Sequence, residues 1–154
     1  WPAAGGSKGY PGMISAIATL LQSDSELTTI LSGGIYGKVL EINRQLTPDA
    51  FDANSELQPC AIIKAGTVTP FGPHVHGHSQ SLEIYLYQRA GYTAIEAAAR
   101  RIYQLLHNSR IEPTADFGCW LITQTYSNLS LEDPALKCNL GLLRFQALIS
   151  ILEV

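Results

Sequence analysis

Three histidines alternate with other residues in the segment His74-Val-His-Gly-His78. In an extended backbone, side chains two residues apart point to the same side, so three such imidazoles could converge on a metal ion. The segment also lies among Gly and Pro residues, which are typical of a solvated connection between strands. The spacing alone leaves both interpretations open, with His74, His76 and His78 as the candidate metal ligands.

His76 and His78, together with Glu83, resemble the first metal-binding motif of the cupins, in which a His-x-His pair and a glutamate bind a metal inside a barrel. The chain departs from that motif at Pro70, where cupins have a glycine, and nothing matches their second motif. Because a metal site needs three or four converging ligands held in place by further groups, we expect no bound metal and no cofactor. A small metal-binding enzyme or ligand-binding domain that uses the three histidines is the alternative.

Other residues that could carry out catalysis are poorly placed. The chain has no G-x-S-x-G sequence around a nucleophilic serine. His78 and Ser79 are adjacent, so in a strand they point to opposite faces and cannot form a base–nucleophile pair. Glu132 and Asp133 lie in a polar, turn-like stretch, without the apolar surroundings that raise a carboxyl pKa. We therefore expect that the protein is not an enzyme.

The composition points to assembly rather than to nucleic-acid binding. Charged residues make up 15% of the 154 residues, well below the roughly 25% of typical soluble domains. A chain with so little charge is expected to hide part of its surface against other subunits. Ten Lys and Arg against thirteen Asp and Glu give a net charge of −3, so we expect no sequence-specific nucleic-acid binding. An acidic protein still allows DNA to pass without sticking to it.

The length corresponds to one domain. Residues 1–12 are rich in Gly and Pro and are expected to form a flexible arm, followed by a single domain over residues 13–154. The chain has no apolar stretch long enough for a membrane helix. Its three cysteines, Cys60, Cys119 and Cys138, form no C-x-x-C pair, which favours a reducing, cytosolic compartment. Cys60 and Cys119 lie in apolar, strand-like stretches, and we expect them to be small buried side chains.

Hydrophobic periodicity predicts an α+β fold, with a mostly antiparallel sheet of four to five strands, an amphipathic helix packed on one face, and N-terminal helices. Thr93 and Glu96 predict a capping box at the start of the amphipathic helix. Loops are expected at 43–58 and 67–79. The expected helices are 13–21, 24–31 and 93–106, and the expected strands are 35–42, 59–65 (ended by Gly66), 82–88, 117–126 and 140–152.

The last strand is apolar on both faces, with Ile149 on one and Leu148 and Leu152 on the other. In so small a domain, this pattern indicates that a second subunit covers one face. Tyr85 and Tyr87 share the face of their strand that is opposite its apolar side, where they suit a protein contact; isolated exposed tyrosines are the other interpretation. The candidate interface residues are therefore Tyr85, Tyr87, Leu148, Ile149 and Leu152.

The order of these elements resembles the tail terminator, or tail-completion, proteins of long-tailed bacteriophages. These are small α+β proteins that begin with a helix like 14–21 and place a strand like 82–89 just before an amphipathic helix like 93–106. They end in two strands, of which the last would be 140–152 here. The resemblance spans residues 13–154 and lies in pattern and element order.

The resemblance implies a structural virion protein that forms a ring, usually a hexamer, on the head-proximal end of the tail tube. Such a ring ends tail-tube polymerisation and docks the head–tail connector proteins, while DNA passes through its central hole. It implies assembly in the host cytoplasm, a final place in the neck of the virion, and no catalytic residues. Another neck protein, such as a head-closure or adaptor ring, is the alternative within the same class.

Overall fold

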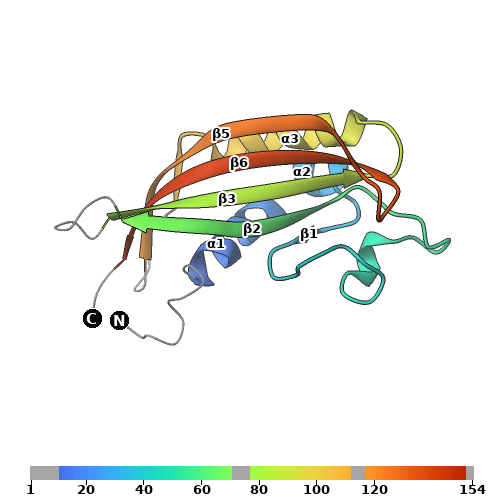
Figure 1. The fold of residues 1–154 in the computed structure, drawn as a ribbon, viewed down its shortest axis with the longest axis horizontal. Helices are drawn as coiled ribbons and strands as arrows, with labels where there is room; N and C mark the ends of the chain where they lie inside the picture. The colour runs from blue at the N-terminus through green and yellow to red at the C-terminus, as the bar shows by residue number, and fades with distance from the viewer. Residues whose placement is uncertain (1–10, 71–76, 112–116, 152–154) are drawn as a thin grey trace.

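In a computed structural model, residues 11–70, 77–111 and 117–151 are described. They form an α+β fold in which three helices lie on one side of a single curved sheet (Figure 1). The elements are α1 (Pro11–Gln22), α2 (Ser25–Ile30), β1 (Ile35–Tyr36), the 3-10 helix η1 (Pro48–Ala50), β2 (Cys60–Pro70), β3 (Gly77–Gln88), α3 (Thr93–Leu106), β4 (Ser109–Ile111), β5 (Phe117–Asp133) and β6 (Cys138–Ile151).

Over the described ranges the sheet has six strands, in the order β1-β2-β3-β6-β5-β4. Only β1 runs parallel to its neighbour, and β2, β3, β6, β5 and β4 alternate in direction. The predicted α+β class and mostly antiparallel sheet are confirmed, with more strands than the four to five expected. The N-terminal helix begins at Pro11, two residues before the expected boundary, and the rest of the expected arm lies outside the described residues.

The main core lies between the helices and the face of the sheet that they cover. Alternate residues along each central strand point to this face, and the apolar stripes of α1 and α3 pack against them. The largest side chain in this core is Phe145, which is fully buried. Its other members include Met13, Ile17, Leu21, Leu27, Ile63, Leu82, Ile84, Ile95, Ile102, Leu143, Ala147 and Ile149.

A second, smaller core lies on the opposite face of the sheet, which carries no α-helix among the described residues and is called the helix-free face below. The segment between β1 and β2, expected to be a loop, folds over one end of this face and buries Ile42, Ala50 and Leu57 against it. Thr47 is fully buried within the segment, and its hydroxyl both donates to the Asn43 carbonyl and accepts from the Asn43 N–H. The segment is thus an ordered cover with its own hydrogen bonds.

The strands β2 and β3 extend beyond their expected ends, into the segment 67–79 that was expected to be a connection. Gly66 does not end β2, because a register shift between Ala65 and Val68 absorbs it as a bulge and pairing continues to Pro70. The expected strand 35–42 is reduced to two residues. At its end Gly37 lies against α1, where a Cβ atom would lie 3.1 Å from side-chain atoms of Ile14 and Ala18.

At the opposite edge of the sheet, β5 is seven residues longer than expected, and β4 was not predicted from the sequence. β5 continues through the polar run after Tyr126 to Asp133, still paired with β6. The three-residue strand β4 follows α3 and pairs with the first part of β5. Its shortness explains the omission, since three residues show no periodicity.

The predicted capping box at Thr93 and Glu96 is wrong. Tyr92 is the N-cap residue of α3 and makes no side-chain cap hydrogen bond. Instead, Oε1 of Gln88 at the end of β3 accepts from the N–H groups of Ala94 and Ile95, at 2.8 and 3.2 Å. The helix is therefore capped from the preceding strand.

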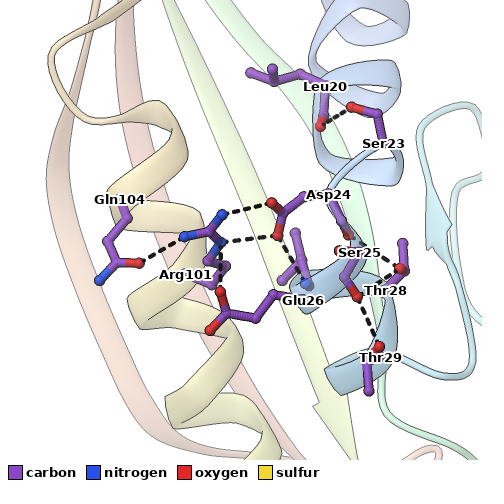
Figure 2. A network of polar contacts seen from close by, with 10 residues as sticks. Leu20, Ser23, Asp24, Ser25, Glu26, Thr28, Thr29, Arg101 and Gln104 are labelled. Atoms are coloured by element: carbon purple, nitrogen blue, oxygen red, sulfur yellow. Dashed lines mark hydrogen bonds and ion pairs between the residues drawn. The ribbon is translucent and has the colours of Figure 1, made fainter.

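An ion pair joins the second helix to the third (Figure 2). Asp24 is the N-cap of α2 and accepts from the Leu27 N–H at 2.9 Å. The same carboxylate accepts from Nε and Nη2 of Arg101 on α3, at 2.9 and 2.7 Å. Glu26 lies 3.3 Å from the same guanidinium. This contact fixes the helical layer that backs the sheet.

Candidate interaction surface

The histidine candidates fall largely outside the described residues. His74 and His76 lie there, and only His78 is placed, half-buried on β3 opposite Ile149. Within the part of the chain that the structure describes, no group of three or more His, Cys, Asp or Glu side chains could hold a metal ion. The metal-site interpretation therefore rests on the sequence spacing alone.

The three cysteines are free and buried, as expected for Cys60 and Cys119. Burial raises the pKa of Cys60 to about 12 and that of Cys138 to about 11. Burial likewise raises the pKa of Cys119. Because a thiol must ionise to act as a nucleophile or metal ligand, these side chains serve as small apolar groups in the two cores.

The paired carboxylates Glu132 and Asp133 end β5, directly before the turn that leads to β6. Oδ1 of Asp133 accepts from the backbone N–H groups of Ala135 and Leu136, at 2.9 and 3.2 Å, where the chain reverses between β5 and β6. Glu132 is exposed. This arrangement matches the turn interpretation, in which the Asp side chain bonds to the backbone a few residues on.

The candidate interface residues divide by their burial within the single chain. Ile149 is fully buried in the main core, and Tyr87 is 7% exposed in the second core. Leu152 lies outside the described residues. Tyr85 and Leu148 are half-buried on the helix-free face of the sheet. Of the described candidates, only these last two offer appreciable surface to a partner.

The uncovered part of the helix-free face is crossed by a row of paired positions on β2, β3, β6 and β5. The row is Lys64, Glu83, Arg144 and Tyr126. Arg144 Nε lies 2.9 Å from Glu83 Oε2, and its guanidinium carbon lies 5.0 Å from the centre of the Tyr126 ring. The Lys64 amine lies 5.0 Å from the centre of the Tyr85 ring. Both contacts are in the range of cation–π interactions.

These contacts leave a surface of compensated charge and aromatic rings. Burial and then the Glu83 carboxylate raise the pKa of Tyr85, so its phenol stays neutral at physiological pH. The next two rows, toward the end of the sheet where Pro70 pairs with His78, are polar and then partly apolar. Gln146 of the first row donates to Ser79 of the second, in which Leu121 lies opposite Leu148. Tyr, Arg and half-buried Leu side chains favour protein contact. Sequence reasoning found Tyr85 and Leu148 here but missed Arg144 and Tyr126, which only the strand register brings together.

A groove of about 450 Å³ runs between α3 and β5, on the other side of the sheet. Arg100 and Tyr103 of the helix line it, together with Gln124 and Leu129 of the strand. Oε1 of Gln124 is buried and has no hydrogen-bond partner in the structure. The groove is open to solvent. The residues that line it include no pair of side chains placed for acid–base or nucleophilic catalysis.

No protein-family model matches this sequence, and no curated protein matches it. A solved structure does match in fold, a chain described as "Virion of native gene transfer agent (GTA) particle". The TM-score is 0.65 and the sequence identity is 14%, and the match covers 90% of this chain and 94% of that one. The two chains therefore share a fold over almost their whole lengths.

None of the described helices is both long and apolar enough to cross a membrane.

Proposed function

We propose that this chain is a structural virion protein of a phage-like particle, the tail terminator at the head–tail junction. In this role it forms a ring, a hexamer, on the head-proximal end of the tail tube, ends tube polymerisation and docks the connector. DNA passes through the ring without sequence-specific contacts. Assembly takes place in the host cytoplasm, and the protein acts without catalysis or a cofactor.

The observation that carries the proposal is the near-complete fold match with a chain of a gene transfer agent virion. Because the match leaves little of either chain unpaired, it concerns the whole domain rather than a shared substructure. It agrees in class with the resemblance drawn from element order alone. A common fold does not by itself fix a function, so the surface chemistry matters as a second line of support.

That surface chemistry suits a ring. The net charge of −3 favours a channel that does not hold DNA. A closed ring built from heterologous contacts needs two different patches on each subunit. The helix-free face with Arg144 and Tyr126 and the α3–β5 groove with Arg100 lie on opposite sides of the sheet, so each subunit offers distinct surfaces to its neighbours, the tube and the connector.

The test is a tail-tube assembly reaction watched by electron microscopy. Tail-tube protein of the same virus is polymerised with and without this chain, which carries a small gold-binding tag. The proposal predicts that the chain labels one end of each tube and stops growth, so that tubes become shorter as its concentration rises. Tubes of unchanged length with no end label contradict the terminator role.

The same reaction separates the proposal from its alternatives. A head-closure or adaptor protein would label connectors and leave tube growth unchanged, so purified connectors are added as a parallel sample. A metal-binding domain based on His74, His76 and His78 would carry stoichiometric metal, which elemental analysis of tag-free protein measures directly. Either result would replace the terminator assignment.

A further inference from the structure

The sheet has two open backbone edges, one on each side. β1 covers β2 only at Ala61 and Ile62, and β4 covers β5 only as far as Ile122. Beyond these points, no strand of the described ranges pairs with the outer side of β2 or of β5. Open edges carry unpaired N–H and C=O groups and pair readily with another strand.

On β2 the open edge runs from Lys64 to Pro70. The Ala61 N–H donates toward β1, to the Gly34 carbonyl. Since backbone N–H groups alternate in direction along a strand, the Ala65 N–H points to the same side, past the end of β1. Ala65, Thr67 and Thr69 are all exposed, so this edge is accessible.

On β5 the open edge begins after Gln124, whose N–H donates to Nδ1 of His107 at 3.0 Å. It continues from Thr125 to Asp133, where β5 is still paired with β6 on its inner side. Thr125, Tyr126 and Ser127 are exposed. His107 thus blocks the last position near β4 and leaves the rest of the edge available.

The middle of each open edge carries no charged side chain. Charged side chains, above all lysines, commonly prevent edge-to-edge pairing. Here no Lys, Arg, Asp or Glu lies between Ala65 and Leu82, or between Phe117 and Leu131. Pro70 stands only at the far end of β2. Charged residues stand only at the ends of these open edges, Lys64 on β2 and Glu132 and Asp133 on β5.

The strand directions make the two edges complementary. β2, β3, β6 and β5 alternate in direction, so β5 runs opposite to β2. When a second copy is placed beside the first with its sheet in the same orientation, its β2 therefore lies antiparallel to the first copy's β5. The alternation of the sheet then continues without a break from one copy to the next.

The open segments of β2 and β5 lie at different heights along the strand direction, so neighbouring copies must be shifted relative to each other. The open part of β2 lies toward the end of the sheet where Pro70 pairs with His78, and the open part of β5 lies toward the opposite end, where Leu131 pairs with Leu140. Closing a sheet into a ring requires strands that tilt and shift in register. Bulges, which both edges contain, supply the necessary bend.

From this geometry we infer that neighbouring copies of this chain join edge to edge, residues 125–131 of β5 in one copy pairing antiparallel with residues 64–70 of β2 in the next. The inference rests on the proposed ring and names the contact that closes it. Because the contact is heterologous, each copy uses both edges and no edge remains free in the closed assembly.

Cysteine cross-linking tests the contact. Thr69 on β2 and Asn128 on β5 both lie on the helix-free face, at paired positions opposite Ser79 and Leu142. In this pairing Thr69 lies opposite Tyr126 and is the diagonal neighbour of Asn128, so the full-length double variant Thr69→Cys/Asn128→Cys is treated with a short flexible bismaleimide that spans such neighbours. We expect a ladder of covalent multimers that stops at the ring number, because each chain carries both halves of the link.

Control variants measure how much cross-linking occurs without the proposed contact. Each single cysteine variant should stop at dimers, and the unaltered chain should not cross-link, because Cys60, Cys119 and Cys138 are buried. A second double variant, Thr69→Cys/Thr29→Cys, places one thiol on the exposed surface of α2 and should give no ladder. In a separate experiment, Thr69→Lys should raise the protein concentration at half-dissociation by about tenfold or more, whereas Thr29→Lys should leave it unchanged.

The outcomes separate this inference from the proposed function. A discrete oligomer without the ladder, and unaffected by Thr69→Lys, overturns the edge pairing and leaves the terminator role standing. The ladder without end-labelled tail tubes supports the edge pairing and overturns the terminator role. A chain that stays monomeric both free and with tail tubes overturns both.

Discussion

Asp24 and Arg101, 77 residues apart, form a two-bond ion pair that links α2 to α3, and Asp24 is at the same time the N-cap of α2 (Figure 2). One carboxylate thus starts a helix and attaches it to the next one. The pair lies in the helical layer, away from both sheet edges, so it concerns the stability of the subunit and not its assembly.

This pair predicts a specific acid sensitivity. The hydrogen bond from Arg101, followed by that from the Leu27 N–H, lowers the pKa of Asp24 to about 2. An unfolded Asp has a pKa of about 3.9, so the stabilisation is fully present above that value and is lost as the pH falls through about 2. Urea unfolding between pH 5 and pH 2 should show a smaller loss of stability for Asp24→Asn than for the unaltered chain. Glu132→Gln, at an exposed site, is the control, and equal slopes for both variants would contradict the assignment.

The cap of α3 gives a second prediction. Gln88→Ala removes the acceptor for the Ala94 and Ile95 N–H groups and should lower the free energy of unfolding by about 0.5–2 kcal/mol, the usual cost of losing a helix cap. Thr93→Ala should cost clearly less, because the Thr93 side chain does not cap the helix. Chemical denaturation measures both, and a larger loss for Thr93→Ala would restore the capping box.

Gly141 allows α3 to approach β6 closely. A Cβ atom at this position would lie 2.7 Å from Cγ2 of Ile95. Gly141→Ala should therefore destabilise the fold by about 1–3 kcal/mol, as overpacking of cores does. A double-mutant cycle with Ile95→Ala isolates the clash, because the Gly141→Ala penalty should shrink once the Ile95 methyl is gone. An unchanged penalty would show that the cost lies elsewhere.

Variants at Ile149 and Leu148 distinguish an effect on folding from an effect on assembly. Ile149→Ala should cost about 2–5 kcal/mol in the free energy of unfolding, because Ile149 is fully buried in the main core. Leu148→Asp lies on the helix-free face and should keep the subunit folded, as judged by circular dichroism, while weakening the oligomer in sedimentation. If Leu148→Asp leaves the oligomer intact, the helix-free face near Leu148 is not a contact.

The sequence predicted the elements whose pattern is local and regular. The stripe from Ile95 to Leu106 matches α3, and the alternation from Leu82 to Leu86 matches the central part of β3. The burial of Cys60 and Cys119 also followed from their apolar surroundings.

The missed features depend on partners far away in the chain. The polar residues after Tyr126 were expected to form a loop, but pairing with β6 holds them in a strand. Gly66 and the two prolines near 70 indicate a break, and a bulge absorbs the glycine instead. The contact surface was the hardest to predict, since Arg144 meets Glu83 and Tyr126 only through the register of three strands.

The most direct test of the ring is the mass of the tag-free full-length chain by light scattering, free and after incubation with tail tubes, with metal content measured on the same peak. The account predicts a discrete ring without stoichiometric metal, about 100 kDa for six copies of the 16.7 kDa chain. The ring forms either in free solution or only on the tubes. A monomer or dimer in both samples that does not bind tubes, or that carries one metal ion per chain, would contradict it.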